Sequence, residues 1–150
     1  MDEEEEPRRI LLIDDDPGLL AAISDGLSLV GGYEVIQASD GAMGLEAFFT
    51  VQPDCVVVDV RMPGLNGYQF VRALRGDPET AQTPIIVLSA LVQDHEQLAG
   101  LLTGADAYLT KPVKIVTLVR TIDDALRVTA AERKRRVWQL SEGMAKGEGA

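Results

Sequence analysis

Short apolar runs alternate with amphipathic stretches between residues 8 and 128 of this chain. The pattern predicts five strands, at Arg9–Ile13, Tyr33–Gln37, Cys55–Val60, Pro84–Ser89 and Ala107–Thr110. The first, third and fourth runs are continuous and rich in β-branched residues, which is typical of parallel strands buried on both faces. The second and fifth runs are weaker, so we expect them at the edges of the sheet.

The amphipathic stretches predict a helix after each strand. The first helix begins with Asp16 as N-cap and Pro17 at its first position, and Gly31-Gly32 ends it. Further helices are predicted at about 41–51, 67–75 and 94–103, and the last begins near Lys114. Because crossovers between parallel strands are right-handed, this (βα)5 order predicts an α/β fold with an open, doubly wound, five-stranded parallel sheet. Ligands of such a sheet bind at the carboxyl ends of its strands.

Composition narrows the class of protein. The chain has 150 residues, 46% hydrophobic and 25% charged, which suits one domain with a single core. It contains no apolar run of the roughly 18 residues that a membrane helix needs, and its acidic start is unlike a signal peptide. We therefore expect a cytoplasmic protein with no membrane partner. The single cysteine, Cys55, excludes a disulfide scaffold and a thiolate-rich metal site, and it is predicted to be a core thiol.

The charge is unevenly distributed. The net charge of −10 argues against direct nucleic-acid binding by the surface as a whole. Residues 1–7 are predicted to form a disordered acidic tail, 8–128 the folded domain, and 129–150 a helical extension with a flexible end. No Gly or Pro occurs between Val113 and Glu142, so we expect the last helix to continue to about Leu140.

Three interpretations of the basic segment 131–140, which also contains Trp138, stay open. The first is the solvated end of a helix. The second is an interaction segment that forms a homodimer or docks on a partner protein. The third is a contact for an acidic surface or nucleic acid.

Polar residues collect where the predicted strands end. Asp14 and Asp15 follow the first strand, Asp59 and Ser89 lie at the ends of the third and fourth, and Lys111 follows the fifth. The carboxyl ends of adjacent parallel strands lie close together, so these side chains are expected to converge on one pocket. Carboxylates that close repel one another unless a divalent cation such as Mg²⁺ binds them. A neighbouring lysine would hold a phosphoryl group.

Each of these residues also has a plain structural interpretation. The aspartates after the first strand can cap the following helix, and Asp59 can cap the turn at Met62-Pro-Gly64. Ser89 can be a small turn residue and Lys111 a solvated side chain. The functional interpretation depends on their joint occurrence at successive strand ends.

Four motifs resemble those of the receiver domain of bacterial response regulators, a flavodoxin-like fold, over about residues 8–128. They are Leu11-Leu-Ile-Asp-Asp-Asp-Pro17, Val56-Val-Val-Asp-Val-Arg-Met-Pro-Gly-Leu-Asn-Gly67, Ile86-Val-Leu-Ser-Ala90 and Gly104-Ala-Asp-Ala-Tyr-Leu-Thr-Lys-Pro112. Their order and spacing make the resemblance specific.

The resemblance implies a role for each matching residue. Asp59 would be the phosphoacceptor, and Asp14, Asp15, Asp59 and the backbone carbonyl of Arg61 would hold Mg²⁺. Asp15 and Asp59 would ligate directly, and Asp14 through water. Three further residues have roles toward the phosphoryl group, because Lys111 would pair with it, Ser89 would hydrogen-bond it, and Tyr108 would be the aromatic that responds to Ser89. The Lys111-Pro112 bond is usually cis in this family.

The implied function is a signalling switch rather than an enzyme with an external substrate. Phosphoryl transfer from a sensor histidine kinase or a histidine phosphotransfer protein to Asp59 would change the surface for an unidentified downstream protein. One alternative is a Mg²⁺-dependent phosphohydrolase with an Asp nucleophile, although here the nucleophile lies on the third strand and no length is left for a cap. Another is an unphosphorylated docking module, which the presence of every site residue disfavours.

Overall fold

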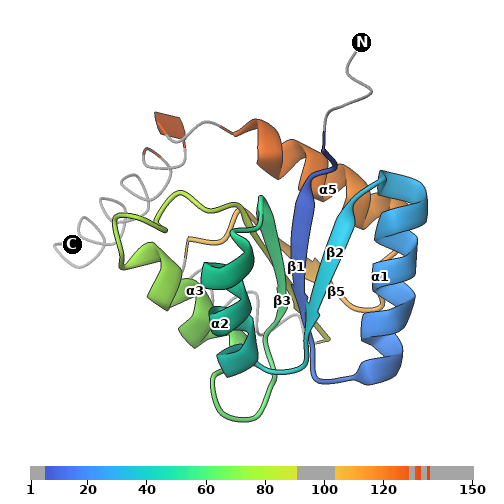
Figure 1. Cartoon of the computed structure of the whole chain (residues 1–150), viewed down its shortest axis with the longest axis horizontal. Coiled ribbons are helices and arrows are strands. Elements are labelled where there is room, and N and C mark those ends of the chain that lie inside the picture. Colours follow the sequence, from blue (N-terminus) through green and yellow to red (C-terminus); the bar gives the residue numbers. More distant parts are fainter. Residues whose placement is uncertain (1–5, 91–103, 129–130, 133–134, 136–150) are drawn as a thin grey trace, which may run out of the picture.

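The computed structural model describes residues 6–90, 104–128, 131, 132 and 135 (Figure 1). Five parallel strands form one sheet in the order β2-β1-β3-β4-β5. The strands are β1 (Arg9–Ile13), β2 (Glu34–Ala38), β3 (Cys55–Asp59), β4 (Ile85–Ser89) and β5 (Ala107–Thr110). The parallel sheet is confirmed, and the two weaker runs do lie at its edges. Cys55 is completely buried, as expected of a core thiol.

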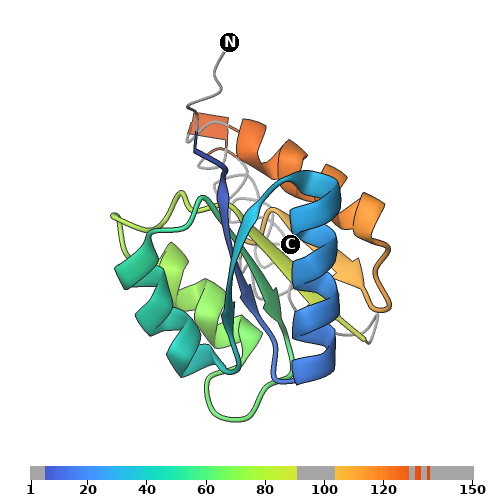
Figure 2. The ribbon, with the colours of Figure 1, turned by 45° about the vertical axis from the view of Figure 1, so that its right-hand side comes forward.

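Helices cover both faces of the sheet, as Figures 1 and 2 show. The described helices are α1 (Pro17–Gly31), α2 (Gly41–Val51), α3 (Gly67–Arg75) and α5 (Ile115–Arg127). Side chains alternate between two buried clusters along each central strand, as the pleat requires. Leu11 and Val56 lie in the cluster under α2 and α3, whereas Leu12 and Val57 lie in the cluster under α1 and α5.

The start of β2 differs by one residue from the prediction. The backbone N–H of Tyr33 donates to the carbonyl of Leu27, and that of Gly32 donates to Ser28, so both residues belong to the C-terminal cap of α1. Gly32 has a φ of 70°, which a glycine adopts without strain. The strand therefore begins at Glu34, after the helix cap is complete.

The prediction of one helix from Lys114 to about Leu140 is wrong, because α5 ends at Arg127. Val128 is extended, with φ −71° and ψ 127°, and residues 131, 132 and 135 are helical again. The last buried residue of α5 is Ala125, so packing on the sheet no longer supports the helix at Val128. Val128 is followed in the sequence by Thr129, and such β-branched residues favour extended backbone once packing is lost.

Some predictions concern residues that the structure does not describe. The helix expected at 94–103 lies outside the described residues, as do residues 1–5 of the acidic tail and most of the basic segment, including Trp138. None of the described helices is both long enough and apolar enough to cross a bilayer.

Candidate functional site

Three carboxylates meet where β1 and β3 end. The two strands are neighbours, with Ile13 opposite Val58, so the residues that follow them come together at the carboxyl edge of the sheet. Oxygen atoms of Asp14, Asp15 and Asp59 lie within 4.8 Å of one another. Asp14 is 1% exposed and Asp59 7%, whereas Asp15 is exposed. The convergence expected from the sequence is thus present for all three residues.

The backbone around β1 fixes the Asp14 carboxylate. Its own N–H donates to the carbonyl of Ala38 on β2 at 3.1 Å, and its Oδ1 accepts from the N–H of Asp16 at 2.9 Å. The side chain of Asp16 instead accepts from the N–H groups of Gly18 and Leu19 at the start of α1. Asp16 is therefore the helix cap that the sequence predicts.

Lys111 brings a positive charge into the acidic cluster. Its Nζ lies 2.7 Å from Asp14 Oδ2 and 2.9 Å from Asp59 Oδ1, so one ammonium group joins two carboxylates at the ends of β1 and β3. Its backbone N–H donates to the carbonyl of Ser89 at 2.7 Å, which attaches the end of β5 to the end of β4. The Lys111-Pro112 peptide bond is cis, as the resemblance implies.

The site shifts the pKa of both partners in this ion pair. Burial raises the pKa of Asp59 above its ordinary value, and repulsion from Asp14 and Asp15 acts in the same direction, while Lys111 opposes the rise. Burial by itself lowers the pKa of Lys111, but its hydrogen bonds and attraction to Asp14 and Asp59 outweigh that effect and raise it. Lys111 therefore remains an ammonium, and its presence favours the charged form of Asp59.

The other expected residues lie around this cluster. Ser89, 1% exposed, is the last residue of β4, and the register places it opposite Thr110. Tyr108 on β5 is half-buried against the core cluster under α2 and α3. Arg61 lies two residues after the end of β3 and is exposed. The structure therefore brings the carboxylates and Lys111 together, with Ser89 on the adjoining strand end.

Gly67 supports the site, although only its place in a motif drew attention to it in the sequence. It is the first residue of α3, and its N–H donates to the carbonyl of Val60. A Cβ at this position would lie 2.6 Å from the carbonyl oxygen of Asp59, closer than real contacts allow. The start of α3 therefore packs directly against the backbone that carries Asp59.

The carboxylates suit a hard divalent cation. Mg²⁺ prefers oxygen ligands and keeps several waters, so one or two carboxylates are enough to bind it. Both oxygens of Asp14 already accept hydrogen bonds, one from Asp16 and one from Lys111. Asp15 is exposed, and Asp59 has a second carboxylate oxygen besides the one that contacts Lys111. The carboxylates of Asp14, Asp15 and Asp59 therefore form a donor set that fits a hard divalent cation.

Comparisons with known proteins point to one family. Residues 10–123 match the family described as the response regulator receiver domain. The chain is 38% identical over 121 residues to the DNA-binding dual master transcriptional regulator RpaA of Synechocystis, covering 81% of this chain and 50% of that protein. It is also 38% identical over 118 residues to protein PilH of Pseudomonas aeruginosa, covering 79% of this chain and 97% of PilH.

Solved structures agree with these matches. A response regulator from Chloroflexus aurantiacus matches with a TM-score of 0.75 at 32% identity, covering 82% of this chain and 100% of that one. Chemotaxis protein CheY4 of Vibrio cholerae matches with a TM-score of 0.72 at 30% identity, covering 80% of this chain and 99% of that one. The chain spans about half the length of several curated relatives that it matches, including RpaA.

Proposed function

Because the chain belongs to the response regulator receiver domain family, we propose that it is a two-component signalling switch with Asp59 as the phosphoacceptor. One observation carries the assignment of Asp59. This carboxylate is 7% exposed, and it lies at the end of a central strand beside two other aspartates and in contact with Lys111. A buried carboxylate whose charged form is favoured by a neighbouring ammonium group is arranged for nucleophilic attack.

The phosphodonor in this proposal is a phosphohistidine of a sensor histidine kinase or of a histidine phosphotransfer protein. The Asp59 carboxylate attacks phosphorus in line, an O–P bond forms as the P–N bond breaks, and the electron pair leaves with the imidazole. The product is an acyl phosphate on Asp59. Lys111, which contacts Asp59 already, stays beside the new phosphoryl group and offsets its charge.

Mg²⁺ completes the proposed site. Asp15 and Asp59 would hold it directly, the backbone carbonyl of Arg61 would be a further ligand, and Asp14 would act through water, since its two oxygens are already engaged. When bound, the cation neutralises charge on the phosphoryl oxygens. Asp15→Ala should therefore weaken Mg²⁺ binding by at least about tenfold, because a direct oxygen ligand is lost.

The output of the switch begins at Ser89 and Tyr108. The phosphoryl group adds about two negative charges and strong acceptor oxygens, to which the Ser89 hydroxyl donates. As the family resemblance implies, movement of Ser89 on β4 would let Tyr108 on the neighbouring strand β5 turn inward. A downstream protein then binds the altered surface around β5. We also propose that the switch acts in the cytoplasm.

Phosphorylation by acetyl phosphate with Mg²⁺, followed by intact mass spectrometry, tests this function. The wild type should gain one phosphoryl group, Asp59→Asn none, and the control Asp124→Asn, at an exposed position on α5, one group. Full incorporation in the Asp59→Asn protein would mean that the nucleophile lies elsewhere. Repeated turnover of an ordinary phosphomonoester would identify the protein as a phosphohydrolase instead.

A further inference from the structure

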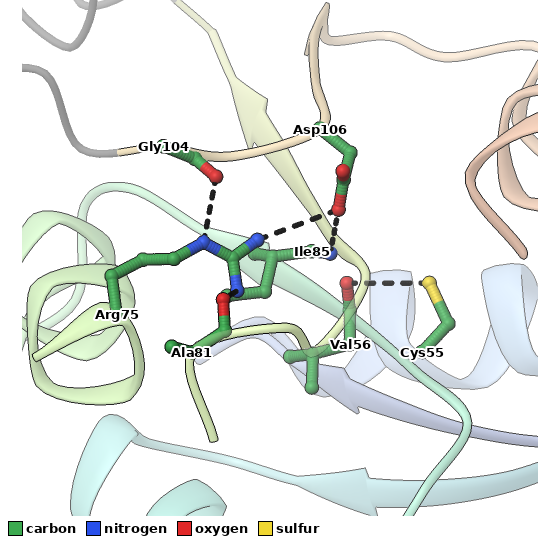
Figure 3. Close-up of polar contacts among 7 residues, drawn as sticks. All are labelled: Cys55, Val56, Arg75, Ala81, Ile85, Gly104 and Asp106. Carbon is green, nitrogen blue, oxygen red and sulfur yellow. Dashed lines mark hydrogen bonds and ion pairs between the residues drawn. The ribbon is translucent and has the colours of Figure 1, made fainter. Parts of the chain in front are cut away.

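Arg75 joins three segments at the edge of the sheet opposite the aspartates. It is the last residue of α3, and its side chain is 11% exposed. Its Nε donates to the carbonyl of Gly104 at 2.8 Å, one terminal nitrogen donates to Ala81 at 3.0 Å, and the other lies 3.5 Å from the carboxylate of Asp106 (Figure 3). One guanidinium group thus holds the α3–β4 loop and the residues that lead into β5.

Asp106, which contacts Arg75, is also hydrogen-bonded to the first residue of β4. Its carboxylate, 3% exposed, accepts from the N–H of Ile85, the first residue of β4, at 2.7 Å (Figure 3). Its own N–H donates to the carbonyl of Ile85 at 2.8 Å. Asp106 therefore forms a closed pair with Ile85, immediately before β5 begins at Ala107. We call Arg75, Gly104, Asp106 and Ile85 the Arg75 cluster.

Gly104 lets the guanidinium approach closely. Its φ is 78°, a left-handed conformation that glycine adopts without strain. A Cβ at this position would lie 3.3 Å from Arg75 Nε and 3.4 Å from two carbons of the same side chain. The Arg75 side chain therefore packs over the glycine, and the backbone of the segment before β5 is fixed against the end of α3.

Contacts at the two ends of β5 add to the pairing and packing that position this strand. It is an edge strand of four residues with a single strand neighbour, β4. Tyr108 packs on one core cluster and Leu109 on the other, so a slip of one residue would exchange their faces. The Arg75 cluster fixes the first end of the β4–β5 pair, and the hydrogen bond from Lys111 to Ser89 closes the other end.

We propose that Arg75 is a positioning residue that, through Asp106, fixes the register of β5 on β4 and so places Lys111 relative to Ser89. The effect on phosphorylation rests on the function proposed above, whereas the effect on register does not. A buried ion pair is a poor source of stability, because desolvation offsets its attraction, but it can specify one register over another. A role in register agrees with the described contacts of Arg75 and Asp106, which join the end of α3 and the α3–β4 loop to the residues where β4 and β5 begin.

Arg75→Met, which keeps the length of the side chain without its donors, tests the proposal in the whole chain. The maximal rate of phosphorylation by acetyl phosphate should fall about tenfold or more, because a displacement near 1 Å of a catalytic group has effects of this size. The affinity for Mg²⁺ should change less than the rate does, because the carboxylates of Asp14, Asp15 and Asp59 follow β1 and β3 rather than β5. Arg75→Lys should recover part of the rate, since an ammonium retains the charge but not the planar fork of donors.

Leu27→Ala is the control for a general loss of stability. Leu27 is buried on α1, on the other side of the molecule from Arg75. Both variants are compared with the wild type at a temperature where each is folded. Amide hydrogen exchange then reports on register directly, and in Arg75→Met the Lys111 N–H should lose protection relative to the N–H of Val57 on β3. In Leu27→Ala the two amides should keep their ratio of protection.

The outcomes separate the two proposals. If Arg75→Met keeps the wild-type rate, or if Leu27→Ala loses as much rate at equal folded fraction, the positioning role is wrong. Unchanged relative protection of the Lys111 amide in Arg75→Met would overturn it as well. If the wild type takes up no phosphate, the proposed function fails, and the exchange of the Lys111 amide alone decides whether Arg75 sets the register.

Discussion

Replacing Lys111 by methionine should destabilise the protein strongly in the absence of divalent cations. The change removes the ammonium group that contacts Asp14 and Asp59 and keeps most of the volume of the side chain. Two carboxylates would then face each other, one 1% and one 7% exposed, without a counter-charge. A buried charge that loses its partner is one of the larger single causes of instability.

The distances set the size of the effect. At 2.7 Å and 2.9 Å and an effective dielectric constant of about 20, each contact contributes roughly 6 kcal/mol of attraction. Desolvation of the ions offsets most of this attraction, so breaking such a pair costs about 3–5 kcal/mol net. The Lys111 side chain is 18% exposed, which places the expected loss near the lower end, at about 3 kcal/mol.

The loss should depend on pH in a definite direction. Because burial raises the pKa of Asp59, the folded state binds this proton more tightly than the unfolded state does. The proton on Asp59 therefore adds to the free energy of unfolding in acid. This contribution is lost as the pH rises above 3.8, the ordinary pKa of the carboxyl group. Without Lys111, which lowers the pKa of Asp59 in the wild type, this loss becomes larger. The deficit of Lys111→Met should shrink in acid and be largest at neutral pH.

Urea unfolding followed by circular dichroism at neutral and acidic pH, with EDTA or with excess Mg²⁺, measures these effects. Lys114→Met is the matched control, because Lys114 is exposed and its side chain makes no hydrogen bond that caps α5. This variant should change the free energy of unfolding by no more than about 0.5 kcal/mol. Mg²⁺ should restore part of the stability that Lys111→Met loses. Equal free energies of unfolding for the two variants at neutral pH in EDTA would refute the reasoning.

Three further predictions concern stability. Asp59→Asn should raise the melting temperature in EDTA at neutral pH, because the raised pKa of this carboxyl means that the fold disfavours its charge, and a lower melting temperature would contradict this. Tyr33→Phe removes the hydrogen bond from the phenol to Asp123 and should cost about 1 kcal/mol in urea unfolding, with an unchanged value speaking against the bond. A chain that ends at Thr129 should unfold at the same urea concentration as the whole chain, because α5 ends at Arg127, and a clear loss would show that later residues support the fold.

The sequence by itself determined the sheet and the composition of the site. The continuous run Val56-Val-Val58 is typical of a strand covered on both faces, and glycine pairs and N-caps such as Asp16 end and begin helices by local chemistry. The carboxyl ends of parallel strands share one edge, so the proximity of Asp14 and Asp59 followed from strand order alone. These features depend on the hydrophobic periodicity of short segments and on the few connections that are allowed between parallel strands.

Only the tertiary structure decided which atoms meet. That one ammonium group contacts both Asp14 and Asp59 depends on where β5 lies, which no local pattern near Lys111 encodes. The same holds for Arg75 and Asp106, which are 31 residues apart and meet only because α3 and β5 both pack beside β4. The end of α5 at Arg127 was also hidden from the sequence, since helix propensity continues past it and the helix ends where its packing on the core, last made by Ala125 and Leu126, is lost.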